Sequence, residues 1–170
     1  GLTLLIISAP YRLSRITAFL NPWSDPLGDG FQIIQSLYAL GPGKLLGVGF
    51  GMSIQKYFYL PEPQTDFIFA IIGEELGFIG AIFIIILFYI LSLRGLKIAI
   101  NSVDPFACYV AVGIIAMISL QFIVNISVVI GLIPVTGITL PLLSYGGSSL
   151  TLTLGSIGIL LNISKYTTKI

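Results

Sequence analysis

Histidine is absent from the 170-residue sequence, and cysteine occurs once, as Cys108 within an apolar run. The lack of histidine excludes catalytic triads built on that residue and most zinc sites. A single cysteine cannot form an internal disulfide, and we interpret Cys108 as a small buried apolar residue. Charge is also scarce, because 9% of the residues are charged and the net charge is +1. Such a chain offers no electrostatic field for binding nucleic acid.

Apolar residues make up 56% of the sequence, whereas about 25% of a typical soluble domain is charged. This balance predicts a membrane protein with several spans. Residues 1–9 are apolar but too short to cross about 30 Å of hydrocarbon. No charged segment precedes them, so we do not interpret them as a signal peptide. We expect them to be the end of a truncated span, in the C-terminal part of a larger protein.

Residues 10–65 contain no transmembrane run and are rich in glycine and proline. Ordered loops of this length are uncommon and often functional, so we expect a long outer loop with a role of its own. Residues 31–40 have the periodicity of a short amphipathic helix that lies in the headgroup region. The expected polar face holds Gln32, Gln35, Ser36 and Ala39, and the apolar face holds Ile33, Ile34, Leu37 and Leu40.

Three longer apolar runs predict complete transmembrane spans, at residues 66–93, 105–126 and 148–163. Thr65 or Asp66 is expected to cap the first of these helices. The expected fold is therefore all-α: a single polytopic membrane domain with three full spans, the end of a fourth and a long extracellular loop.

Residues 127–147, between the last two spans, contain several helix-breaking residues, among them Pro134, Gly137, Pro141, Gly146 and Gly147. We expect a re-entrant segment, because irregular backbone at membrane depth is tolerated where protein or water covers it. Basic residues follow the first and the third spans, so the positive-inside rule places those ends in the cytoplasm. The long loop and residues 127–147 then face outward.

Asp66 lies at the junction between the polar loop and the first complete span. Placing a carboxylate in hydrocarbon costs several kcal/mol of free energy. A carboxylate at this position therefore suggests either that it lies at a hydrated interface or that it has a function. Two interpretations stay open: a helix cap, or a base or metal ligand at the mouth of a membrane cavity. Glu62, four residues upstream, favours the second. On a helix Glu74 lies about 80° around from Asp66 and Glu75 nearly opposite, so both glutamates cannot face one site.

Basic side chains of the loop could hold phosphate groups of a lipid substrate or simply contact headgroups. They are Arg12, Arg15, Lys44 and Lys56. The sequence SYGGSS at residues 144–149 predicts the start of a helix. Its backbone N–H groups could bind an anion, or the segment could be a tight turn that serves packing.

The sequence resembles the SEDS family of bacterial cell-wall proteins, which includes FtsW, RodA and SpoVE, in two blocks. The first reads AFLNPWSDPLGDGFQIIQSLYALGPG and continues, after a short gap, with QKYFYLPEPQTDFIFAIIGEELGFIG. The second reads NISVVIGLIPVTGITLPLLSYGGSS. The amino-acid sequence of the first block is more similar to the FtsW/SpoVE branch than to RodA. The resemblance implies that the chain holds the last spans of a larger bundle in the bacterial cytoplasmic membrane.

The same resemblance implies a peptidoglycan glycosyltransferase that polymerises lipid II on the extracytoplasmic side, in cell division or sporulation. Its implied partner is a class B penicillin-binding protein, which cross-links the new strand. The family's essential aspartate lies in a TDFIF setting, which here gives Asp66 the role of general base in an inverting transfer. A divalent cation, Mg²⁺ or Mn²⁺, or loop basic residues would stabilise the polyprenyl pyrophosphate leaving group.

Under this resemblance the expected metal ligands are Asp66 and Glu62. The expected substrate contacts are Lys56, Glu62, Arg12, Gln64, Ser144 and Ser148. Gln64 stands where many relatives have histidine, so a mechanism that needs a histidine proton carrier beside Asp66 fails here. Lys44 and Thr139 also depart from the family pattern, which often has glycine and proline there.

Two other classes stay open beside the polymerase. A flippase or transporter for the lipid-linked precursor would also use broken helices and cavity-facing carboxylates. A non-catalytic scaffold would bind the penicillin-binding protein without turnover. Because earlier spans should supply part of the cavity, we expect this fragment to be inactive alone.

Overall fold

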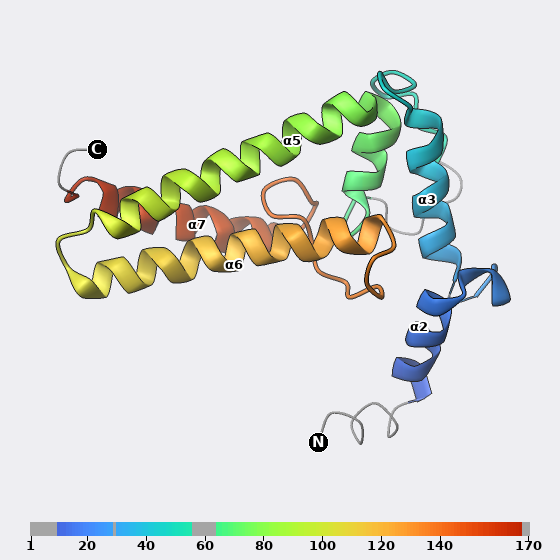
Figure 1. The fold of residues 1–170 in the computed structure, drawn as a ribbon, viewed down its shortest axis with the longest axis horizontal. Coiled ribbons are helices and arrows are strands. Elements are labelled where there is room, and N and C mark those ends of the chain that lie inside the picture. Colours follow the sequence, from blue (N-terminus) through green and yellow to red (C-terminus); the bar gives the residue numbers. More distant parts are fainter. Residues whose placement is uncertain (1–9, 29, 56–63, 168–170) are drawn as a thin grey trace.

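The computed structural model describes residues 10–28, 30–55 and 64–167, with side chains from Ser14 onward. The described helices are α2 (Pro10–Leu20), η1 (Pro22–Ser24), α3 (Phe31–Gly43), α5 (Ile68–Ile100), α6 (Pro105–Val129) and α7 (Gly147–Ser164). Figure 1 shows α5, α6 and α7 side by side in one bundle, with α3 and α2 crossing one end of it. The fold of the described residues is all-α, as the sequence predicts.

Helices α5, α6 and α7 are each long and apolar enough to cross a membrane. They correspond to the three expected spans, although α5 continues past Leu93 to Ile100. Most of their large apolar side chains are exposed. Exposed apolar surface of this extent indicates contact with lipid rather than water.

The start of α6 follows directly from its sequence. Asp104 is the N-cap, and its carboxylate accepts hydrogen bonds from the backbone N–H groups of Phe106 and Ala107. Pro105 takes the first helical position, where the missing N–H has no partner to lose. This cap fixes the tight turn between α5 and α6, and the stacked rings of Phe88 and Phe122, 4.1 Å apart, join the two helices farther along.

Helix α5 is broken at Gly77, which has φ 67° and ψ −165°. Its first segment runs alongside α3, and its second segment runs along α6 (Figure 1). A positive φ is readily adopted only by glycine. The break frees the carbonyl groups of Glu74 and Glu75, and these accept hydrogen bonds from the N–H groups of Val48 (2.9 Å) and Gly49 (3.1 Å).

The loop after α3 also accepts hydrogen bonds from the far side of the break. The N–H of Phe78 donates to the carbonyl of Lys44 (2.9 Å), and that of Ile79 donates to Leu45 (3.2 Å). The two backbones are so close that a Cβ on Gly77 would lie 2.3 Å from the nitrogen of Gly47. We call residues 44–49 and the break at Gly77 the loop–helix joint.

Helix α3 begins at Phe31 as predicted and continues to Gly43, but its expected polar face is wrong. Ser36 and Ala39 are buried, and Leu37 is exposed. The reason is that α3 packs against α5 and α6, where the Ser36 hydroxyl donates to the carbonyl of Val129 (2.8 Å). Helix α2, which begins at Pro10, was not expected from the sequence.

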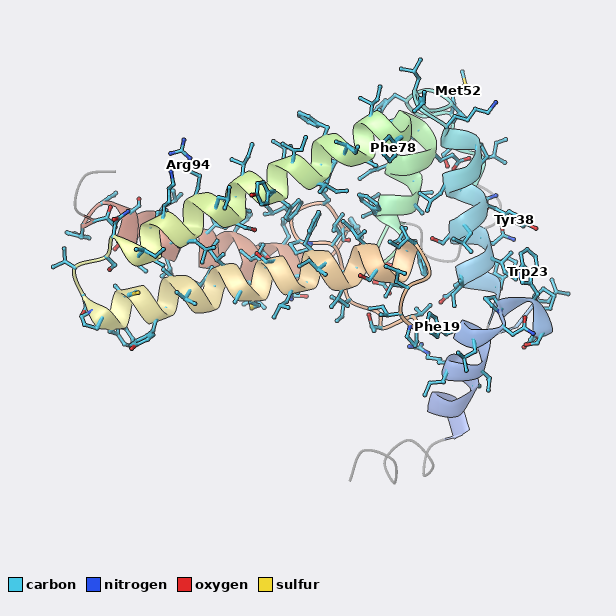
Figure 2. The ribbon with its side chains drawn as sticks, viewed as in Figure 1. Phe19, Trp23, Tyr38, Met52, Phe78 and Arg94 are labelled. Atoms are coloured by element: carbon cyan, nitrogen blue, oxygen red, sulfur yellow. The ribbon has the colours of Figure 1, made fainter. Side chains whose placement is uncertain are left out.

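Aromatic and basic side chains mark the two ends of the structure. The rings of Trp23 and Tyr38 meet edge to face with centroids 5.9 Å apart, at the end where α3 lies. Arg94 projects near the opposite end of α5 (Figure 2). Tryptophan and tyrosine are enriched at membrane interfaces, so the exposed pair fits an interfacial depth.

Candidate active site around Asp66

Asp66 lies in a turn of residues 64–67 that leads into α5, and its side chain is half-buried. The predicted cap at Thr65 or Asp66 is wrong, because Phe67 occupies the N-cap position. Phe67 is anchored in the core, and its carbonyl accepts the N–H of Ala70 at 2.9 Å. The helix therefore starts later than expected, and Asp66 precedes it.

The backbone of this turn is held by other parts of the chain. The carbonyl oxygens of residues 64, 65 and 66 each accept one hydrogen bond from outside the turn. The donors are, in that order, the N–H of Tyr145 (2.7 Å), the hydroxyl of Ser144 (2.5 Å) and the carboxamide of Asn125 (2.7 Å). This arrangement fixes the position from which the Asp66 side chain projects.

Asn125 is buried in α6 and connects three segments. Besides the carbonyl of Asp66, its carboxamide nitrogen donates to the carbonyl of Ile138 at 2.8 Å. Its oxygen Oδ1 is buried and accepts no hydrogen bond from the described residues. Because both N–H groups are used, the orientation of the amide is defined. Asn125 joins α6, the irregular segment 130–146 and the start of α5.

The irregular segment 130–146 passes beside the Asp66 carboxylate at Gly137. This glycine has φ 73°, and a Cβ added to it would lie 3.6 Å from Oδ2 of Asp66. The segment is also tied to α2, since Arg15 donates to the carbonyl of Val135 at 2.9 Å. Bare backbone, rather than a side chain, therefore borders this face of the carboxylate.

The other predicted substrate contacts differ in their surroundings. Gln64 is exposed, and Ser148 is exposed in the first turn of α7. Ser144 is buried, and its hydroxyl donates to the carbonyl of Thr65 and accepts the N–H of Leu140 at 2.7 Å. Its described contacts make Ser144 a positioning residue for the turn.

Three predicted residues cannot be placed relative to Asp66. Lys56 and Glu62 lie outside the described residues, and so does the side chain of Arg12. Among the residues that the structure describes, no three histidine, cysteine, aspartate or glutamate side chains gather as metal ligands. The roles of Lys56, Arg12 and Glu62 therefore stay predictions.

The two glutamates of α5 face different surroundings, as their spacing predicts. Glu74 is 1% exposed and accepts hydrogen bonds from the Ser53 hydroxyl (2.5 Å) and the N–H of Ile54 (3.1 Å). Glu75 lines a pocket with Gln64. Sequence reasoning did not identify the contacts of Glu74 or Asn125, although a polar residue inside an apolar helix is a signal for such a role.

Three helices long and apolar enough to span a membrane, one of them broken, and an irregular segment folded beside them define a multi-pass membrane protein. The chain belongs to the FtsW/RodA/SpoVE family of cell cycle proteins, whose family model matches residues 1–169.

Curated relatives agree with this membership. The chain is 66% identical over 166 residues to stage V sporulation protein E of Bacillus subtilis, covering 98% of this chain and 45% of that protein. It is 51% identical over 160 residues to the probable peptidoglycan glycosyltransferase FtsW of Geobacter metallireducens, covering 94% of this chain and 43% of that protein. The chain thus spans somewhat less than half the length of these relatives.

Two solved structures share the fold. One, described as a peptidoglycan synthase complex that coordinates polymerization and crosslinking, matches with a TM-score of 0.69 and 34% identity, over 95% of this chain and 44% of the other. The other is a mutant of the rod shape determining protein RodA from Thermus thermophilus, with a TM-score of 0.60 and 32% identity, over 79% of this chain and 41% of the other.

Proposed function

We propose that the protein containing this chain polymerises peptidoglycan glycan strands from lipid II, in division or sporulation. The observation that carries this proposal is the position of Asp66, on a turn in which three carbonyl groups are fixed by donors from α6 and from the segment 130–146. A carboxylate held in this way, with Gly137 backbone beside it, is preorganised for contact with a substrate.

Asp66 acts as general base in this proposal. It accepts the proton of the acceptor sugar hydroxyl while that oxygen attacks the anomeric carbon of the donor. The bond from that carbon to the pyrophosphate oxygen breaks, and polyprenyl pyrophosphate leaves with its electron pair. Attack opposite the leaving group inverts the anomeric centre. General base catalysis of this kind contributes about 10²–10⁴ in rate.

We propose that a divalent cation acts at this site. Mg²⁺ and Mn²⁺ are commonly held by one or two carboxylates together with substrate phosphates, and Asp66 supplies one half-exposed carboxylate. We propose Glu62 as the second ligand. The cation would neutralise charge on the pyrophosphate. Lys56 and Arg12 are proposed for the same phosphates, and Gln64 and Ser148 for the rest of the substrate.

We further propose that the Asp66 end faces the outside of the bacterial cytoplasmic membrane. Arg94, Lys97 and Lys165 lie near the opposite ends of α5 and α7, which favours a cytoplasmic location for those ends. The likeness to a peptidoglycan synthase complex supports a class B penicillin-binding protein as partner. Lipid II would then meet Asp66 on the side where the strand is built.

The test uses the full-length parent protein with its penicillin-binding partner, whose own chemistry is blocked. Glycan formation from labelled lipid II is compared between the parent and Asp66→Asn, which keeps the shape of the side chain but removes the base. Polymer from the parent and none from the folded variant is expected. Polymer from both would remove Asp66 from the mechanism, and polymer from neither would favour a flippase, which lipid II flux across sealed vesicles would detect.

A further inference from the structure

A pocket of about 350 Å³ lies along the first segment of α5, apart from the Asp66 carboxylate. Its walls are isoleucine and leucine side chains of α5 together with Leu143. Gln64 lines it as well, whereas Asp66 does not. The volume is near the lower end for small-molecule pockets, which suits a single ring rather than a whole lipid-linked disaccharide.

Glu75 supplies a buried acceptor in this pocket. Its side chain is 7% exposed, and Oε1 accepts no hydrogen bond from the described residues. The neighbouring Glu74 is satisfied by Ser53 and Ile54. A carboxylate that is mostly buried is costly when it lacks donors, and Glu75 borders the pocket, so a donor on a ligand that meets this carboxylate would offset the cost.

The loop–helix joint brings an aromatic ring to the same pocket. The N–H of Gly49 binds the carbonyl of Glu75 at 3.1 Å, and Phe50, the next residue, lines the pocket. The Phe50 side chain is 88% exposed, so the described part of the chain leaves its ring open to a ligand. The loop–helix joint thus brings Phe50 and Glu75 to the same pocket.

The lining selects the chemistry of the ligand. An acyl chain would fill the apolar walls but leave Glu75 without a donor. A sugar residue offers hydroxyl or amide N–H donors together with an apolar C–H face that packs on an aromatic ring. An exposed ring, one acceptor and one carboxamide therefore match a sugar better than a lipid tail.

We propose that this pocket is a subsite for one amino-sugar residue of the glycan strand. Glu75 accepts a hydrogen bond from its hydroxyl or acetamido N–H, and Phe50 packs on its ring. The proposal rests on the proposed polymerase function. Because Asp66 does not line the pocket, the bound residue is a neighbour of the reacting sugars and not one of them.

The test measures binding without turnover. The full-length parent carrying Asp66→Asn is titrated in nanodiscs with a soluble, lipid-free peptidoglycan tetrasaccharide, and Kd is determined by calorimetry. Glu75→Met removes the acceptor at similar volume, and Kd should rise on the order of tenfold. Glu75→Gln keeps an acceptor oxygen and should retain most of the affinity.

Two controls separate this role from a structural one. Glu75→Met removes an unsatisfied buried acceptor, so its Tm should be unchanged or higher although binding weakens. Phe50→Leu should weaken binding, whereas Phe106→Leu, which alters an exposed ring at the start of α6, should not. If Glu75→Met fails to fold, the comparison of Kd between Phe50→Leu and Phe106→Leu decides whether the subsite exists.

An unchanged Kd in Glu75→Met or in Phe50→Leu would overturn the subsite. Equal losses in Glu75→Gln and Glu75→Met would also overturn it, because they would show that a cation, such as a lipid ammonium headgroup, binds there. The proposed polymerase function can be rejected independently of the subsite. Tetrasaccharide binding that depends on Glu75, in a parent that forms no polymer, would retain the subsite and reject the polymerase.

Discussion

The carboxamide of Asn125 donates to the backbone carbonyl of Asp66 at 2.7 Å and to that of Ile138 at 2.8 Å. One side chain of α6 therefore fixes both the turn that carries the candidate base and the segment that borders it. Any movement of the Asn125 end of α6 relative to α5 would change the geometry around Asp66.

Replacing Asn125 by alanine should lower both stability and glycan synthesis. Two partly buried carbonyl groups would lose their donor, at a cost of up to about 1–3 kcal/mol each. Thermal unfolding in detergent and the lipid II assay measure the two effects. Gln121→Ala, one turn earlier in α6, is the control. A Tm for Asn125→Ala equal to that of the control would contradict the role of Asn125.

Gly137→Ala should reduce activity more than stability. The positive φ would strain the alanine by about 1 kcal/mol, and its methyl group would stand 3.6 Å from Oδ2 of Asp66. Gly131→Ala is a matched control, because Gly131 has φ 71° but its Cβ would face Ile33 and Leu37. Both variants should lose similar stability, and only Gly137→Ala should lose most of its polymerisation rate. Equal activities would show that the space beside Asp66 is not used.

A double-mutant cycle should reveal coupling between Ser53 and Glu74. Ser53→Ala removes the hydroxyl that donates to Oε2 of Glu74, and Glu74→Leu removes the carboxylate that accepts this hydrogen bond. The double variant should be less destabilised than the sum of the single variants, with a coupling of about 0.5–3 kcal/mol. Strict additivity of the Tm changes, converted to free energies, would argue that the 2.5 Å contact contributes nothing.

Gly77→Ala should destabilise the protein strongly. The added Cβ would lie 2.3 Å from the nitrogen of Gly47, and φ is 67°. The loop–helix joint would have to separate, with loss of the hydrogen bonds across it. Gly158→Ala, in α7 with nothing within 4 Å of its Cβ, should be neutral or slightly stabilising. Thermal unfolding of both variants tests this contrast, and similar Tm values would disprove the steric argument.

The membrane spans could be predicted from the sequence because hydrocarbon excludes charge and forces the backbone into helices. The break in α5 could not. Gly77, Gly80 and Gly95 all interrupt the same apolar run, yet only Gly77 leaves the helical conformation. The difference lies in the loop at residues 44–49, which supplies donors and acceptors at that point alone. Such a contact depends on tertiary structure.

The candidate site was predicted in part. Asp66 was selected by its position at a polar–apolar junction and by the family resemblance. Ser144 was predicted to contact substrate, whereas its hydroxyl binds the backbone on both sides. A serine hydroxyl is suited to either role, and the sequence does not show which acceptor lies nearest. The same holds for Asn125, whose two acceptors come from distant segments.

The break at Gly77 also changes how far α5 reaches. An unbroken helix from Ile68 to Ile100 would be about 50 Å long at 1.5 Å per residue, well beyond about 30 Å of hydrocarbon. From Phe78 to Ile100 the length is about 35 Å, which matches the bilayer with a modest tilt. The first segment, before Gly77, is therefore not needed to span the bilayer, and it runs in a different direction from the segment that does. Asp66, at its tip, is displaced laterally from the axis of the spanning helix instead of standing above it, and it lies beside Asn125 of α6.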